Sequence, residues 1–164
     1  MSDQVSLTRW ARGFTLIELM ITVTILGILL SLAAPSFSTF IAEQRLKNAS
    51  FELQGALMLA RNAAMTRGLP ASVSVSAKNS DWSNGWTVAT GGVTLGDAGA
   101  FERISITTAN PATQSLVYFG DGRTTQTPAF SLSFPSNAKV KPRCIRIDTS
   151  GMPFGKTTAE GACS

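Results

Sequence analysis

The sequence predicts an α+β protein in which a long N-terminal helix packs on an antiparallel β-sheet head. Three observations carry this prediction: an apolar run from Phe14 to Ala34, a helical pattern of small and apolar residues over 35–68, and an alternating pattern after residue 69. A sheet with one apolar face needs a second layer to cover it, and the only long amphipathic surface available is the helix of residues 35–68. That helix is therefore expected to lie on the head, residues 69–164.

The apolar run is long enough to cross a membrane. Its length of about 21 residues, at about 1.5 Å per helical residue, matches a hydrocarbon core of roughly 30 Å. Arg9 and Arg12 precede the run and no basic residue interrupts it, so the positive-inside rule places the short N-terminus in the cytoplasm. We therefore expect one transmembrane segment, residues 14–34, and an extracytoplasmic head.

The helical pattern continues beyond Pro35, which is expected to interrupt the helix locally because proline lacks a backbone donor and clashes with the preceding turn. Its far end is marked by Arg67-Gly68-Leu69-Pro70, a basic residue followed by glycine and proline. The apolar and small positions of this amphipathic stretch form one expected buried line. They are Ile41, Leu46, Ala49, Leu53, Ala56, Leu57, Ala60 and Ala64.

From Ala71 onward, apolar residues alternate with polar ones between turn residues, which predicts antiparallel strands. The pairs that carry the pattern are Val73 and Val75, Trp86 and Val88, Ile104 and Ile106, Leu116 to Phe119, Leu132 and Phe134, and Cys144 to Asp148. Residues 79–85 read as a polar loop, and Thr90-Gly91-Gly92 and Gly120-Asp121-Gly122 read as turns. An adhesive aromatic surface at Trp82 and Trp86 is one interpretation, but we favour a core position for Trp86.

Cys144 and Cys163 are the only cysteines, and an even pair in an exported domain favours a disulfide over a reactive thiol. The closed loop of about 20 residues would contribute roughly 3 kcal/mol by the chain-entropy estimate. The pair therefore predicts an oxidising compartment and a C-terminus tied to the preceding strand.

The composition argues against enzymes. The chain has no histidine, which excludes Ser-His-Asp and Cys-His nucleophiles and histidine metal sites, and no P-loop is present. We expect no cofactor, no metal and no catalytic residue. The net charge of +4 would become +3 without residues 1–13, because two arginines and one aspartate lie there.

Glu18 is the anomaly of the apolar run. A lone carboxyl group near one end of a bilayer helix costs up to roughly 2–3 kcal/mol and is usually functional. If the chain were cut after Gly13, the new amine of Phe14 would be a cation, and Glu18 could pair with that amine on a neighbouring copy. Such a pair would select the stagger between subunits.

Residues Gly13-Phe14-Thr15-Leu16-Ile17-Glu18-Leu19 resemble the class III signal of type IV pilins and pseudopilins. The resemblance implies that prepilin peptidase removes residues 1–13 as a leader and methylates the amine of Phe14. Pro35 is similar to the proline that follows the transmembrane half of the pilin helix. The stretch 57–64 resembles the helix end of the GspH-like minor pilins, the FimT/FimU group, although an acidic residue common there is Ala63 here.

This resemblance implies a minor pilin that primes or caps a type IV pilus. Its implied partners are other minor and major pilins through the N-terminal helix, prepilin peptidase, the inner-membrane assembly platform, and membrane lipid before assembly. The implied location is the inner membrane, with a single span and a periplasmic head, and then the pilus, at its tip. The alternatives are a type II secretion tip pseudopilin, a DNA-uptake pilin and a major subunit.

Two further alternatives concern the N-terminus alone. Ser31-Leu32-Ala33 offers a small-x-small pattern that a signal peptidase reads, and a plain membrane anchor would also explain the apolar run. A carboxylate inside the run and a helical pattern that continues past Pro35 argue against both. A chain beginning at methylated Phe14 would exclude them.

The late basic residues keep a nucleic-acid function open. Five candidate phosphate contacts are Lys139, Lys141, Arg143, Arg146 and Lys156. Some FimT-type minor pilins take up DNA with an arginine-bearing motif after a C-terminal glycine, whereas residues 150–156 here carry Met152 and Phe154. Strand alternation also puts Lys141 and Arg143 on one face and Arg146 on the other, so we favour a solvated strand edge.

Overall fold

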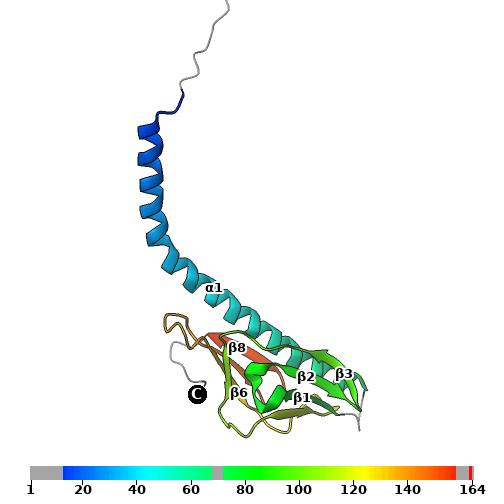
Figure 1. The fold of residues 1–164 in the computed structure, drawn as a ribbon. Helices are drawn as coiled ribbons and strands as arrows, with labels where there is room; N and C mark the ends of the chain where they lie inside the picture. Colours follow the sequence, from blue (N-terminus) through cyan, green and yellow to red (C-terminus); the bar gives the residue numbers. More distant parts are fainter. Residues whose placement is uncertain (1–12, 68–71, 158–162, 164) are drawn as a thin grey trace, which may run out of the picture. The chain divides into compact units, whose positions relative to one another are not determined.

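The structure, a computed structural model, describes residues 13–67, 72–157 and 163, without the side chains of residues 32–35, 67 and 157. It contains one long helix and eight strands, and it divides into two compact units, one ending at Ser38 and one from Thr39 to Ser164 (Figure 1). The elements of the head are β1 (Val73–Ala77), β2 (Trp86–Thr90), β3 (Val93–Asp97), β4 (Ser105–Thr108), β5 (Ser115–Tyr118), β6 (Ala129–Ser133), β7 (Arg143–Ile147) and β8 (Pro153–Thr157), with two short 3-10 turns, η1 (Lys78–Ser80) and η2 (Trp82–Asn84).

The helix α1 runs from Leu16 to Arg67. Gly68, Leu69 and Pro70, which were expected to mark its end, lie outside the described residues, as does the side chain of Pro35, so the interruption there stays a prediction. Among the described residues no single straight helix is long and apolar enough to cross a membrane, whereas segments Leu16–Ser31 and Ser36–Thr66 together meet the requirement of length and composition.

The strands form two antiparallel sheets of four, in the orders β3-β2-β1-β5 and β4-β6-β7-β8. The α+β prediction is confirmed, and the structure adds the division into two sheets. Two edge strands, β3 and β8, were not predicted. Each contains a glycine, and β8 also begins with proline, so neither shows the alternation of a central strand.

The core lies between the second half of α1 and the two sheets. Leu46, Leu53 and Leu57 of α1 are at most 1% exposed, and they join residues of both sheets in one apolar cluster. Ile41 was expected on the buried line but is 37% exposed, and Ala42 is buried in its place. Helical geometry explains the difference, because Ala42 lies one turn before Leu46 on the same face and Ile41 does not.

The loop before β2 is not uniformly polar. Trp82 sits in η2, is 3% exposed and donates its indole N–H to the backbone oxygen of Thr113 at 2.8 Å. Trp86 is 1% exposed and stacks on Phe101 at 5.2 Å between ring centroids. Both tryptophans therefore belong to the core, and the aromatic adhesive surface is absent at these two positions.

A disulfide joins Cys144 of β7 to Cys163, as predicted, with 5.5 Å between the two Cα atoms. It connects Cys163, near the C-terminal end of the chain, to the second residue of the central strand β7. At Gly91 and Gly92 the backbone takes positive φ values of 53° and 80°, which suits the tight turn between β2 and β3. The turn predicted there is thus a hairpin.

Candidate assembly segment and basic residues

The first turn of α1 is fixed by Thr15. The hydroxyl oxygen of Thr15 accepts a hydrogen bond from the backbone N–H of Glu18 at 3.2 Å, and its carbonyl accepts one from the N–H of Leu19 at 3.1 Å. A threonine followed three residues later by glutamate is the sequence signature of a helix N-cap. This signal is present in Thr15-Leu16-Ile17-Glu18, although the cap was not predicted from it.

The Glu18 carboxylate is exposed and has no ion-pair partner within the described part of the chain. Its backbone is engaged by Thr15, so its side chain is the part of the residue that remains available. A carboxylate in an apolar environment needs a cation or hydrogen-bond donors to offset its desolvation. The residue is therefore suited to receive a cation from another molecule.

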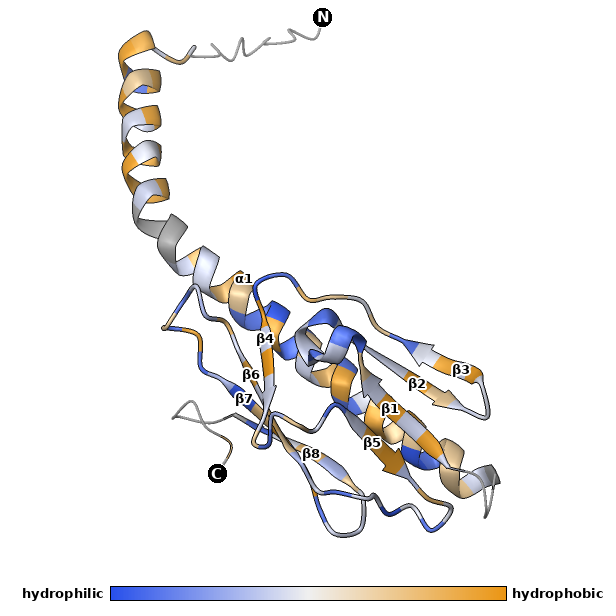
Figure 2. Cartoon of the chain, turned by 60° about the horizontal axis from the view of Figure 1, so that its bottom comes forward, coloured by the Kyte–Doolittle hydropathy of each residue, from blue (hydrophilic) through white to orange (hydrophobic). Residues whose placement is uncertain are grey.

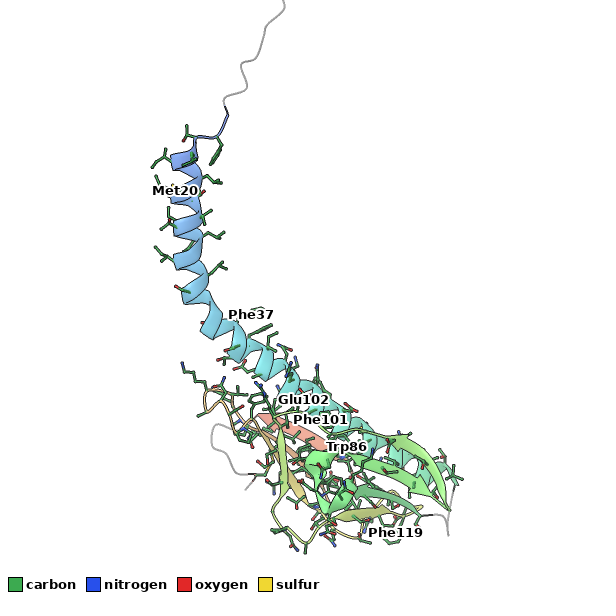
Figure 3. The ribbon with its side chains drawn as sticks, viewed as in Figure 1. Met20, Phe37, Trp86, Phe101, Glu102 and Phe119 are labelled. Atoms are coloured by element: carbon green, nitrogen blue, oxygen red, sulfur yellow. A yellow bond between two sulfur atoms is a disulfide. The ribbon has the colours of Figure 1, made fainter. Side chains whose placement is uncertain are left out.

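Apart from Glu18, the large side chains from Phe14 through the first turns of α1 to Leu30 are apolar and exposed on all sides of the helix. These side chains are 52–77% exposed, and Figure 2 shows the orange, hydrophobic residues distributed around this part of the helix. Figure 3 shows the labelled Met20 pointing away from the helix axis. The large side chains are Phe14, Leu16, Ile17, Leu19, Met20, Ile21, Val23, Ile25, Leu26, Ile28, Leu29 and Leu30.

The hydroxyl groups of Thr22, Thr24 and Ser31 donate their hydrogen bonds within the helix. Thr22 donates to the carbonyl of Leu19 at 2.8 Å, Thr24 to that of Met20 at 2.7 Å, and Ser31 to that of Ile28 at 2.7 Å. Each hydroxyl is thus satisfied within its own helix. An apolar cylinder with one carboxylate can be stabilised by lipid or by other apolar helices.

A small polar cluster lies in the head, at the turn between β7 and β8. Arg61 of α1 donates to the backbone oxygen of Ser150 at 3.3 Å, and burial raises the pKa of the nearby Tyr118 hydroxyl. Hydrogen bonds from the Ser150 hydroxyl and the Met152 N–H hold the pKa of Asp148 below its ordinary value. These contacts fix the turn between β7 and β8, and the described residues contain no group of three metal-binding side chains.

The five basic candidates do not share one surface. Arg143 lies on the face of β7 that carries the buried Ile145 and Ile147, whereas Arg146 lies on the opposite face. Lys156 pairs across from Cys144 and therefore shares the face of Arg146. Lys139 and Lys141 belong to the loop before β7, and both are exposed.

Comparison with known families identifies two regions of the chain. Residues 11–34 match the family described as a prokaryotic N-terminal methylation motif, and residues 49–151 match the family described as type II transport protein GspH. Two fimbrial proteins of Pseudomonas aeruginosa are each 34% identical to the chain over 106 residues, which is 65% of this chain and 66% of each relative.

Solved structures support the same fold. Two crystal structures of the type IV minor pilin FimU from Pseudomonas aeruginosa strain PAO1 are similar to this chain. One has a TM-score of 0.63 at 19% identity and covers 76% of this chain and 98% of its own. The other has a TM-score of 0.60 at 18% identity and covers 72% of this chain and 98% of its own.

Proposed function

We propose, because this chain belongs to the GspH family of pilin-like proteins, that it is a minor type IV pilin that primes or caps a type IV pilus. As a member of this family it is a structural protein and not an enzyme. The observation that carries the proposal is the apolar helix surface from Phe14 to Leu30, which displays a single carboxylate and follows a methylation motif. Such a surface suits a subunit that moves from lipid into a bundle of like helices.

In this proposal, prepilin peptidase cleaves after Gly13 and methylates the amine of Phe14. Residues 14–34 then hold the subunit in the inner membrane, residues 35–68 continue the helix, and residues 69–164 form the periplasmic head. Arg9 and Arg12 precede the apolar segment and orient it. Residues 1–12 themselves lie outside the described part of the chain.

Assembly replaces the lipid around residues 14–34 with neighbouring helices. Glu18 is one helical turn from Phe14, and its carboxylate would pair with the terminal amine of a neighbouring subunit. This pair removes the cost of a lone carboxyl group in an apolar environment. Only one stagger brings the two groups together, so the pair selects the position of the subunit in the filament.

A tip pseudopilin of a type II secretion system is the second candidate. The observation that favours it is the family description itself, which names type II transport. Deletion of the gene separates the two candidates. Loss of twitching and of surface pili supports pilus priming, whereas retained pili with failed exoprotein release supports the secretion filament.

The first experiment is a mass spectrum of the N-terminus of the membrane-bound protein. The proposal expects a chain that begins at methylated Phe14. A chain that begins at Ala34 would be a secreted domain, and a chain that retains Met1 would be a plain anchor. Either of these starts contradicts the proposed role in a filament.

A further inference from the structure

The loop between β6 and β7 is fixed to α1 at the first residue of the head unit. The side-chain amide of Asn137 donates to the hydroxyl of Thr39 at 3.3 Å, and its carbonyl oxygen accepts from the N–H of Lys139 at 3.1 Å. The backbone of Val140 donates to that of Asn137 at 3.1 Å, and the Val140 side chain is 4% exposed. The loop is thus an ordered part of the head, held against the helix.

Thr39 is close to the apolar segment along the chain. It lies five positions after Ala34, which corresponds to about 7–8 Å of helix. The headgroup layer of a bilayer is roughly 5–8 Å thick on each side of the hydrocarbon core. If residues 14–34 fill that core, the short distance along the chain keeps Thr39, and the loop bonded to it, within reach of the headgroups.

This loop carries positive charge. Lys139 and Lys141 are exposed, and their ammonium groups have no ion-pair partner in the described ranges of the chain. Lys141 also lines a surface hollow with Arg143, Leu46 and the single acid Glu43. Lys141 and Arg143 therefore share this hollow with one carboxylate, and Lys139 adds a further cation on the same loop.

We infer that the loop of residues 135–142, through Lys139 and Lys141, binds the anionic headgroups of the membrane in which the subunit is anchored. The chemical class of the ligand is an acidic phospholipid. This contact would hold the head against the bilayer before assembly and be released when the subunit leaves the membrane. The inference rests on the proposed insertion of residues 14–34.

The placement of the charges favours lipid over nucleic acid. Arg146 and Lys156 lie on the outer face of their sheet, so they do not extend the loop into the continuous basic track that a duplex backbone requires. Lysines on long flexible stems can reach several ångströms toward the headgroup layer while their backbone stays outside it. Each lysine near an anionic surface contributes about 1 kcal/mol, or about a fivefold change in the binding equilibrium.

The test uses the full chain reconstituted in vesicles of phosphatidylcholine, with or without phosphatidylglycerol. Flotation with the vesicles measures insertion, and amide hydrogen exchange of residues 136–141 measures contact of the loop. We expect flotation in both lipids, but slower exchange of the loop only with phosphatidylglycerol, and loss of this protection at high salt. Failure of flotation would contradict the membrane anchor, whereas flotation with equal exchange in both lipids would overturn the inference alone.

Single substitutions locate the contact. Lys139→Gln and Lys141→Gln should each weaken the lipid-dependent protection by about fivefold. Arg123→Gln is the matched control, because Arg123 follows Gly122, whose neighbour Met65 is about 39 Å along α1 from Thr39. An equal effect of the control would overturn the inference. Protection by added duplex DNA, and not by phosphatidylglycerol, would also overturn it and identify a nucleic-acid site.

Discussion

The backbone and the carboxylate of Glu18 lie in different environments. Its backbone N–H is bound by the hydroxyl of Thr15, which begins the helix, and its carboxylate is exposed among apolar side chains. The sequence alone was sufficient to single out the carboxylate, because a charge in an apolar run is rare. The N-cap could also have been predicted from Thr15-Leu16-Ile17-Glu18. The pairing of the carboxylate requires a second subunit and stays a prediction.

Replacement of Glu18 tests this pairing. Glu18→Ala should reduce incorporation into filaments to background while cleavage after Gly13 continues, because the peptidase acts before the helices meet. Glu18→Gln is the matched control, since it keeps the shape and the Thr15 cap but removes the charge, and it should fail in the same way. Immunoblots of sheared surface filaments measure incorporation, and immunoblots of membranes measure cleavage. Normal assembly of either variant would contradict the role of the charge.

Asp148 predicts a specific dependence on pH. Hydrogen bonds from Ser150 and Met152 lower the pKa of Asp148 in the folded chain, so the carboxylate stabilises the fold at pH values above its unfolded pKa. This stabilisation is lost as the pH falls through the lower, folded pKa. Asp148→Asn should therefore lower the melting temperature most near about pH 7, and this effect should shrink as the pH falls below the ordinary carboxyl pKa of about 4. A penalty that is constant with pH would show that the charge is not its cause.

At the scale of elements, the helix and six of the eight strands of the described residues followed from periodicity, whereas the edge strands β3 and β8 did not. The buried line through Leu46, Leu53 and Leu57 was visible because helical spacing repeats in the sequence. The strands β3 and β8 were not predicted because each contains a glycine, and β8 begins with proline, which breaks the alternation of apolar and polar residues. The separation of Arg143 from Arg146 follows from strand alternation and was predicted. The bond that joins the loop of Lys139 and Lys141 to α1, from Asn137 to Thr39, links residues far apart in the sequence and could not be predicted.

The helix offers a matched pair of substitutions. Leu53→Ala should lower the free energy of unfolding by about 2–5 kcal/mol, because Leu53 is fully buried and its removal leaves a cavity. Phe51→Ala, two residues away, should change it by no more than about 0.5 kcal/mol, because Phe51 is 55% exposed. Chemical denaturation of the detergent-solubilised chain measures the free energy of unfolding of both variants. Equal changes in the free energy of unfolding would contradict the observation that α1 buries the face of Leu53 and exposes Phe51.

The turn between β7 and β8 gives a second prediction at this scale. Gly151 has a φ of 80°, and a Cβ atom at this position would lie 2.0 Å from the carbonyl oxygen of Gly122. Gly151→Ala should therefore lower the free energy of unfolding by at least roughly 1–3 kcal/mol. Gly55→Ala is the control, because nothing lies within 4 Å of the added carbon and the helix gains stability of about 1 kcal/mol. A destabilised Gly55→Ala protein would indicate a contact outside the described residues.

At the scale of the whole molecule, the disulfide joins the last part of the chain to the second sheet. Removing it in a Cys144→Ser/Cys163→Ser variant should lower the free energy of unfolding by about 2–5 kcal/mol. A reducing agent should lower the melting temperature of the natural chain to that of the variant, and it should leave the variant unchanged. If the natural chain were insensitive to reductant under denaturing conditions, the pair would not be formed in the exported protein.

The contacts of α1 with both sheets also have a mechanical consequence. Gln54 donates to the carbonyl of Pro153 in β8, while the side chain of Leu59 lies against Gly96 in β3. A pulling force that enters the head along the helix is therefore shared between two sheets. Both attachments would have to fail together before the helix could be drawn out, and resistance of this kind is governed by the rate of unfolding and not by equilibrium stability. A head built in this way suits a subunit that must stay folded under tension.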